Sequence, residues 1–258
     1  MKHTRTKDDL IEKLKQVPYT PVADRAAQAE QAAQSLQQQG VAVQTMRVKH
    51  REVLQNSFWS NEWRQHMEVL THDQARLNRG KTYLGQGVVN IFPIKSNSIA
   101  AKVQGKDEYN IRLDFKPLSE LQQTGFRDDV VNTVVSADDL LQPNPSAALQ
   151  QALTHRDHGV FPRKADIKVT CSCPDKQETQ VNVCKHIAAT FYGAGEKIAT
   201  SPKLLYILRN VKLANLVPKK QLPPRSARNS AGVRISSLFK KPGAGVQKHA
   251  ARAAVVKA

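Results

Sequence analysis

Cysteine is scarce in this sequence. Only three cysteines occur among 258 residues, and all of them lie between positions 171 and 184. An odd number of cysteines packed so closely is not the framework of a disulfide-stabilised secreted domain. It is typical of thiolates that bind a metal ion in a reducing compartment. Cysteine usage therefore excludes the small secreted class and favours a metal site within one short segment.

Long apolar runs are also missing. No stretch approaches the roughly 18 consecutive apolar residues that identify a membrane-spanning helix. The first residues, MKHTRTKDDL, are charged instead of forming the apolar core of a signal peptide. We expect a soluble protein of the cytoplasm with no membrane partner, associated with the nucleoid in a bacterium or located in the nucleus of a eukaryote.

Acidic residues are absent from the C-terminal part. After Glu196 there is no Asp or Glu, whereas fourteen Lys and Arg residues follow. The formal charge of the whole chain is +17, so the first 196 residues carry only +3. A segment with charges of one sign favours a polyanionic partner, DNA first and RNA as a further possibility.

Residues 214–258 are dominated by Pro, Ser, Gly, Ala, Lys and Arg, which predicts a basic tail that is disordered when free. Having almost no aromatic residues, the tail should bind nucleic acid without sequence preference and with a strong salt dependence. Its apolar island ISSLF, residues 235–239, is either a docking motif or chance composition. The tail residues predicted to contact phosphates are Lys219, Lys220, Arg225, Arg228, Lys240 and Lys241.

Alanine and glutamine dominate residues 22–39, within an N-terminal segment that we bound at 1–57. These strong helix formers are followed by Gly40, a residue that commonly ends helices. The apolar side of the predicted helix is mostly alanine. It is therefore either a weakly packed surface helix or one half of a self-association seam.

Residues 58–123 have the pattern of a compact α+β module. Trp59, Trp63, Met67 and Leu70 recur at helical spacing, and a second helix follows with Asp73 as its N-cap. The next stretches, GVVNIFPIK, SIAAKV and YNIRLDF, have the pattern of strands, and the last two alternate apolar and polar residues. We predict a small antiparallel sheet with two helices against it.

The remaining part before the tail divides into a helical connector, residues 124–162, and a segment of strand and helix, residues 163–213. In the connector, breaks are expected at Gly125 and at QPNPS, because glycine and proline disfavour helix interiors. In the second segment ADIKVTCSC predicts a strand, CKHIAATFYGAGEKI a helix, and SPKLLYILRNV one more short helix.

The three cysteines and one histidine have the spacing of a metal site. Cys171 and Cys173 lie two apart on a predicted strand, so both thiols point to one face. Cys184 and His186 cannot both lie on one face of a regular helix, so Cys184 should precede the helix and His186 lie in its first turn. Three thiolates and one imidazole complete a tetrahedral zinc shell, which is the form of a structural site. We predict one structural Zn²⁺ held by Cys171, Cys173, Cys184 and His186.

A catalytic role for these residues is the less favoured interpretation. A nucleophilic Cys184 and His186 pair would need a third group to orient the histidine and a cleft for substrate. A redox pair formed by Cys171 and Cys173 would leave Cys184 and His186 without a function. NRGKT at residues 78–82 is not a phosphate-binding loop, because Ala75 stands where that motif requires glycine.

The spacing C-x-C-x10-C-x-H, with CSCPD followed by CKHIAA, closely resembles the SWIM zinc finger. RLNRGKTYLGQGVV, AKVQG and YNIRLDF are similar to the region before the finger in bacterial SWIM-finger proteins, and SPKLLYILRNV is similar to the helix after it. The insert KQETQVNV is longer and more polar than the link often found in the bacterial relatives. The resemblance covers roughly residues 58–213 and implies a zinc-dependent module that binds DNA or protein, often together with a helicase-like remodelling ATPase.

We therefore expect an α+β protein that is not an enzyme and has no small-molecule substrate. In the leading interpretation it is a DNA-binding adaptor, and in the second it is a scaffold whose finger docks a protein and whose tail binds RNA or acidic protein. A solvated surface is the commoner role of charged residues on a folded domain. The basic residues of the folded part that we predict to contact phosphates are Arg79, Lys81, Lys102, Arg112 and Lys185.

Overall fold

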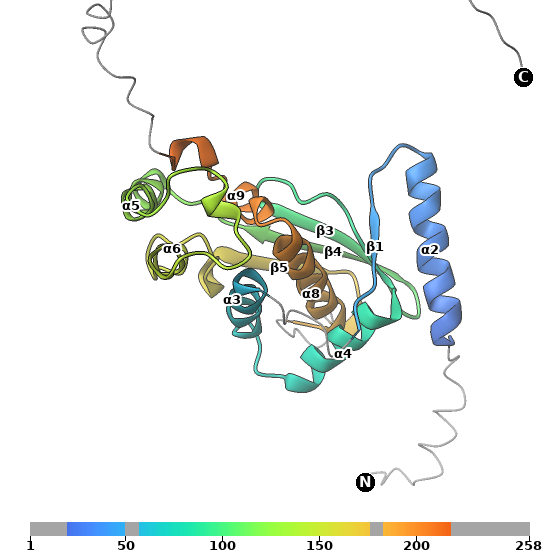
Figure 1. The fold of residues 1–258 in the computed structure, drawn as a ribbon. Helices are drawn as coiled ribbons and strands as arrows, with labels where there is room; N and C mark the ends of the chain where they lie inside the picture. Colours follow the sequence, from blue (N-terminus) through green and yellow to red (C-terminus); the bar gives the residue numbers. More distant parts are fainter. Residues whose placement is uncertain (1–19, 50–56, 176–182, 218–258) are drawn as a thin grey trace, which may run out of the picture. The chain divides into compact units, whose positions relative to one another are not determined.

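A computed structural model describes residues 20–49, 57–175 and 183–217 of the chain. Five antiparallel strands form one sheet in the order β1-β2-β3-β4-β5, so each strand pairs with its neighbours in the sequence. Helix α8 runs along one face of this sheet with α3 and α4 beside it, as Figure 1 shows. The mixture of helices and antiparallel sheet confirms the α+β class.

The strands are β1 (Gln44–Met46), β2 (Val89–Ile91), β3 (Ser98–Gln104), β4 (Glu108–Phe115) and β5 (Ile167–Cys171). In β3 and β4 the apolar residues alternate with polar ones as predicted, and Val103 pairs with Tyr109 across the turn. The sequence did not predict β1. It predicted β5 as part of a separate finger, whereas β5 pairs with β4 and extends the same sheet.

The α-helices are α2 (Val22–Gln38), α3 (Phe58–Glu68), α4 (Gln74–Gln86), α5 (Glu120–Val130), α6 (Ala147–Leu153), α8 (Lys185–Thr200) and α9 (Lys203–Leu208). Three 3₁₀ turns, η2 (Asp139–Leu141), η3 (Lys164–Asp166) and η4 (Leu213–Asn215), complete the described elements. Asp73 caps α4 as predicted, since its carboxylate accepts the backbone N–H of Arg76. Among the described residues no helix is both long enough and apolar enough to span a bilayer.

Helix α8 is the centre of the hydrophobic core. Eleven of its sixteen residues are buried, and they lie on every side of the helix. A helix that is apolar all round needs neighbours on all sides. The sheet covers one side, and α3 and α4 cover others, with the indole N–H of Trp63 in α3 donating to the carbonyl of Phe191 at 2.9 Å.

The crossing of α4 and α8 depends on a glycine. A Cβ added to Gly80 in α4 would lie 2.5 Å from the Cβ of Ala188 and 2.9 Å from the backbone nitrogen of Ala189. These contacts are with a short side chain and with backbone, so neither can move aside without shifting a helix. The two helices can approach this closely only because Gly80 has a hydrogen atom in place of a Cβ.

Replacing Gly80 by alanine should destabilise the fold. Alanine improves helix propensity by about 1 kcal/mol, but overpacking against atoms that cannot move aside costs about 2–3 kcal/mol, so we expect a net loss of about 1–2 kcal/mol. Urea unfolding followed by circular dichroism measures this change. The control is Asn78→Ala, an exposed position of the same helix, which should stay within about 0.5 kcal/mol of the parent. Equal stabilities of the two variants would contradict the assigned crossing.

Helix α2 covers part of the opposite face of the sheet. Asn90 alternates with Val89 and Ile91, so it points away from α8, and its side-chain amide donates to the carbonyl of Ala29 at 2.8 Å. Ala29 and Ala33 are buried on the chain's own sheet. Of the two interpretations of this alanine face, the structure therefore shows the surface helix.

Two boundaries expected from the sequence are wrong. Helix α5 continues through Gly125, because glycine there leaves room for the ring of His158, whose Nδ1 would lie 3.0 Å from an added Cβ. The predicted tail begins too early at residue 214, since Leu216 is buried against the core. The break at QPNPS is confirmed, with Ser146 capping α6. From residue 218 onward the tail lies outside the described residues.

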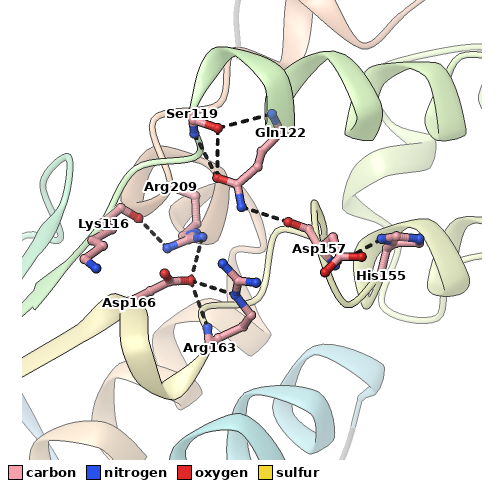
Figure 2. Close-up of polar contacts among 8 residues, drawn as sticks. All are labelled: Lys116, Ser119, Gln122, His155, Asp157, Arg163, Asp166 and Arg209. Atoms are coloured by element: carbon pink, nitrogen blue, oxygen red, sulfur yellow. Dashed lines mark hydrogen bonds and ion pairs between the residues drawn. The ribbon is translucent and has the colours of Figure 1, made fainter.

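A buried arginine ties the end of α9 to the sheet, as Figure 2 shows. The side chain of Arg209 is 1% exposed, donates to the carbonyl of Lys116 after β4, and forms an ion pair of 3.2 Å with Asp166 before β5. Asp166 also accepts the backbone N–H of Arg163 at 3.2 Å. The boundaries placed at residues 123 and 162 therefore do not separate hydrophobic cores, because segments on both sides meet at this pair.

Removing Arg209 should be costly, because buried Asp166 would keep only the longer ion pair, 3.5 Å, with the half-exposed Arg163 side chain. We expect Arg209→Met to lower the free energy of unfolding by about 3 kcal/mol or more, the usual cost of breaking one half of a buried ion pair. Lys203→Met, an exposed position of α9, is the matched control. Thermal unfolding of both variants tests the assignment. Equal melting temperatures of Arg209→Met and Lys203→Met would contradict it.

Candidate metal centre

The four predicted ligands come from two elements that meet at the end of the sheet. Cys171 is the last residue of β5 and Cys173 follows two positions later. Cys184 is the N-cap of α8, and His186 lies in the first turn of that helix. The structure therefore brings together all four residues, with the helix start placed as the spacing predicted.

The ligand atoms converge. One nitrogen of His186 and the three cysteine Sγ atoms all lie within 4.8 Å of one another. The Sγ atoms of Cys171 and Cys184 are each 3.9 Å from His186 Nδ1. In a tetrahedral shell with bonds of about 2.0–2.3 Å, ligand atoms lie about 3.5–3.8 Å apart. Small side-chain adjustments would close the set around one ion.

The local backbone favours thiolates. The backbone N–H groups of Cys173 and of Ile187, in the first turn of α8, lower the pKa values of the Cys171 and Cys184 thiols respectively. Hydrogen bonding from Cys171, followed by His186 and Ile187, holds the pKa of Cys184 far below its usual range, whereas the same pairing raises the pKa of Cys171. The centre thus provides a ready thiolate, and a bound cation would draw the proton from the second thiol.

Aromatic rings enclose the histidine. The rings of Tyr109 and Tyr83 lie 4.5 Å and 5.4 Å from the His186 ring, and His186 is 1% exposed. Its second nitrogen, Nε2, is buried without a hydrogen-bond partner within the described residues. A Cβ at Gly105 would lie 3.2 Å from Nε2, so the turn between β3 and β4 closes over this edge of the ring. The histidine is held mainly by packing, with Nδ1 directed at the thiols.

All four ligand residues are buried, and their donor atoms are close enough for one cation. This buried group of three cysteines and one histidine could therefore bind a metal ion. Sequence reasoning found the ligands from their spacing. It missed Tyr83, Tyr109 and Gly105 around them, because no spacing rule connects these distant positions to the cysteines.

A second group of possible ligands is separate from the first. His155 and His158 do not approach the cysteines but lie with Asp129, their candidate ligand atoms within 4.8 Å of one another. His158 Nε2 is 2.6 Å from an Asp129 carboxylate oxygen, and the two histidine rings stack at 3.6 Å. His155 Nδ1 accepts the backbone N–H of Asp157 (Figure 2). These contacts give each histidine a polar partner, from α5 for His158 and from its own turn for His155.

The basic residues predicted to contact phosphates are differently placed. Lys81 pairs with Glu68 at 3.5 Å, Lys102 with Glu108 at 2.5 Å, Arg112 with Asp114 at 2.7 Å, and Lys185 with Asp175 at 3.0 Å. Arg79 is exposed and forms no ion pair within the described residues. Lys219, Lys220, Arg225, Arg228, Lys240 and Lys241 lie outside the described residues.

No protein-family model and no solved structure matches the chain. A curated relative, "Uncharacterized protein Rv2102" of Mycobacterium tuberculosis (strain ATCC 25618 / H37Rv), is 28% identical over 130 residues, which cover 49% of this chain and 46% of that protein. The chain thus matches less than half of that relative's length, and the SWIM resemblance stays a prediction.

The centre predicts a defined metal stoichiometry. Chain purified without chelator should hold one ion, and Cys184→Ser should lose most of it, because a serine hydroxyl is a poor replacement for a thiolate. Ser172→Ala, between two ligands, is the control and should keep the ion. Elemental analysis measures the content, and added Co²⁺ should give the absorption of thiolate-bound cobalt. Full metal content in Cys184→Ser would show that the ion binds elsewhere.

Proposed function

We propose that Cys171, Cys173, Cys184 and His186 hold one structural zinc ion and that the chain is a non-catalytic DNA-binding adaptor. The observation that carries this proposal is the convergence of four buried donor atoms from β5 and the start of α8. Three sulfurs and one imidazole nitrogen suit Zn²⁺, whereas oxygen-rich sites suit Mg²⁺ and Ca²⁺.

The ligand set supports a structural role for the ion. A catalytic zinc keeps a coordination position for water or substrate, whereas four protein ligands fill the tetrahedron. The bound ion supplies a cross-link between the end of β5 and the first turn of α8. The chain's own residues do the rest, since Cys171 belongs to the sheet and His186 to the central helix.

Charge supports DNA as the partner. The net charge is +17, and the segment after Glu196 has no acidic residue. Such a segment attracts nucleic acid through its phosphates and supplies affinity more than sequence preference. RNA satisfies the same electrostatics. A helicase-like ATPase on a separate chain is the further partner that the SWIM resemblance implies.

One observation favours a second function, a protein-interaction scaffold. Lys81, Lys102 and Arg112 all pair with carboxylates of their own chain, which reduces the positive charge that the folded part offers to phosphates. In this alternative the zinc-stabilised region docks a protein, and the tail binds RNA or acidic protein. Partner binding would then change little with salt concentration.

The two functions are separated by DNA binding across a salt series. The samples are the full chain and a truncation after Pro218, each with and without Cys184→Ser, and zinc content is recorded for each. We expect the truncation to bind duplex DNA weakly but measurably at about 50 mM salt, and the same truncation carrying Cys184→Ser to lose at least about tenfold in affinity. Fluorescence anisotropy of labelled DNA gives the dissociation constants.

Both chains in the decisive comparison lack the tail, so the ten Lys and Arg residues after Pro218 cannot mask the result. If DNA binding disappears with the tail while zinc stays bound, the proposed DNA role of the zinc-stabilised region is overturned. The scaffold function then takes its place.

A further inference from the structure

A charged hollow lies beside the metal centre, between α4 and the residues that flank the ligands. It has a volume of about 270 Å³ and is lined by Asp73, Ala75, Arg76, Arg79, Asp175 and Lys185. Three of these residues are cationic and two are anionic, so the hollow has a formal charge of +1. No aromatic ring lines it, which removes the stacking surface that a nucleobase would use.

The ion pairs in the hollow leave donor groups free. The Nε of Arg76 pairs with Asp73 at 2.7 Å, so the two terminal nitrogens of that guanidinium remain able to donate to a ligand. Asp175 pairs with Lys185 at 3.0 Å. Each of the two carboxylates is therefore engaged by one cation. The cationic surplus belongs to Arg79.

Arg79 differs from the other basic residues predicted to bind phosphates. Its side chain is exposed and has no ion-pair partner within the described residues, whereas Lys81, Lys102, Arg112 and Lys185 each have one. A guanidinium presents two parallel N–H groups that match two oxygens of a phosphate. An unpaired arginine at the mouth of a hollow with net positive charge is suited to that contact.

The hollow is connected to the metal ligands through the chain. Lys185 stands between Cys184 and His186, and Asp175 follows Cys173 by two residues. The other wall is α4, which is fixed against α8 where Gly80 meets Ala188. Any group that fixes the ligands also fixes Lys185 and Asp175 relative to Arg76 and Arg79.

We propose that this hollow is a phosphate subsite that binds one backbone phosphate of a nucleic acid, with Arg79 as the principal contact and Arg76 and Lys185 beside it. The inference rests on the proposed function and names the residues of the folded part that would contact the nucleic acid. The subsite contacts the phosphate backbone and not the bases, so its binding has no sequence preference. Because two of its lining residues flank metal ligands, its affinity is linked to occupancy of the metal centre.

The test uses the full chain and compares Arg79→Gln with Arg156→Gln. Arg156 is also an exposed arginine, but it lies in the turn after α6, so both variants lose one charge and keep the tail. Affinity for fluorescein-labelled 20-nucleotide DNA is measured between about 50 and 300 mM salt. Arg79→Gln should weaken binding on the order of fivefold and reduce the salt slope by about one, whereas Arg156→Gln should change affinity less than twofold.

Two further arms identify the source of the phosphate and the role of the metal. Sodium phosphate is titrated calorimetrically, at constant ionic strength, into the full chain and into Arg79→Gln. Tight binding of free phosphate that is lost in Arg79→Gln would overturn the assignment to nucleic acid. The metal-free chain is then compared with the loaded chain in the DNA assay.

The outcomes separate the two proposals. Equal DNA affinity of Arg79→Gln and Arg156→Gln, with zinc retained in both, overturns the subsite even where metal removal weakens binding. Equal affinity of the metal-free and loaded chains overturns both the zinc-dependent function and the link between the subsite and the metal centre, whereas weaker binding by Arg79→Gln would still support the phosphate contact. Both proposals are supported if DNA affinity falls in Arg79→Gln but not in Arg156→Gln, and also falls when the metal is removed.

Discussion

Burial of α8 on all sides is the constraint on which the rest of the structure depends. The helix is too apolar to lie on a surface, so the sheet, α3 and α4 must each supply a face to it. Close approach is possible because the contacting positions are small, with Gly80 against Ala188 and Gly193 against Ile91. The flanking layers could not keep their spacing with larger residues at these contacts.

The candidate metal centre is coupled to this packing because two of its four residues lie at the start of the same helix. Cys184 and His186 start α8, and Cys171 ends the strand that lies next to β4. The ligand set is thus joined to the core by backbone, whereas a finger on a flexible linker would move independently. Tyr109 and Gly105 extend the connection to the β3–β4 hairpin, which encloses the histidine ring. An ion at this place would strengthen contacts that already bury the helix.

Local patterns were sufficient to predict much of this arrangement. The alternation in β3 and β4, the helical spacing of Trp59 and Trp63, and the start of α8 all depend on neighbours in the sequence, and the structure shows each of them. Predictions that needed distant contacts were poorer. The pairing of β5 with β4 and the space that Gly125 gives to His158 depend on tertiary contacts, as do the carboxylate partners of the surface lysines. No local propensity contains such information.

The late position of α8 in the sequence has a consequence for synthesis on the ribosome. Strand β4 ends at Phe115, yet the helix that covers its inner face begins only at Lys185. Chains are synthesised from the amino end at about 5–20 residues per second, so the apolar face of the first four strands stays uncovered for several seconds before α8 is made. Cys171 is made near the end of that interval, and His186 follows it roughly one to three seconds later. Closure of the core and completion of the four-residue candidate metal centre therefore fall within the same short interval of synthesis.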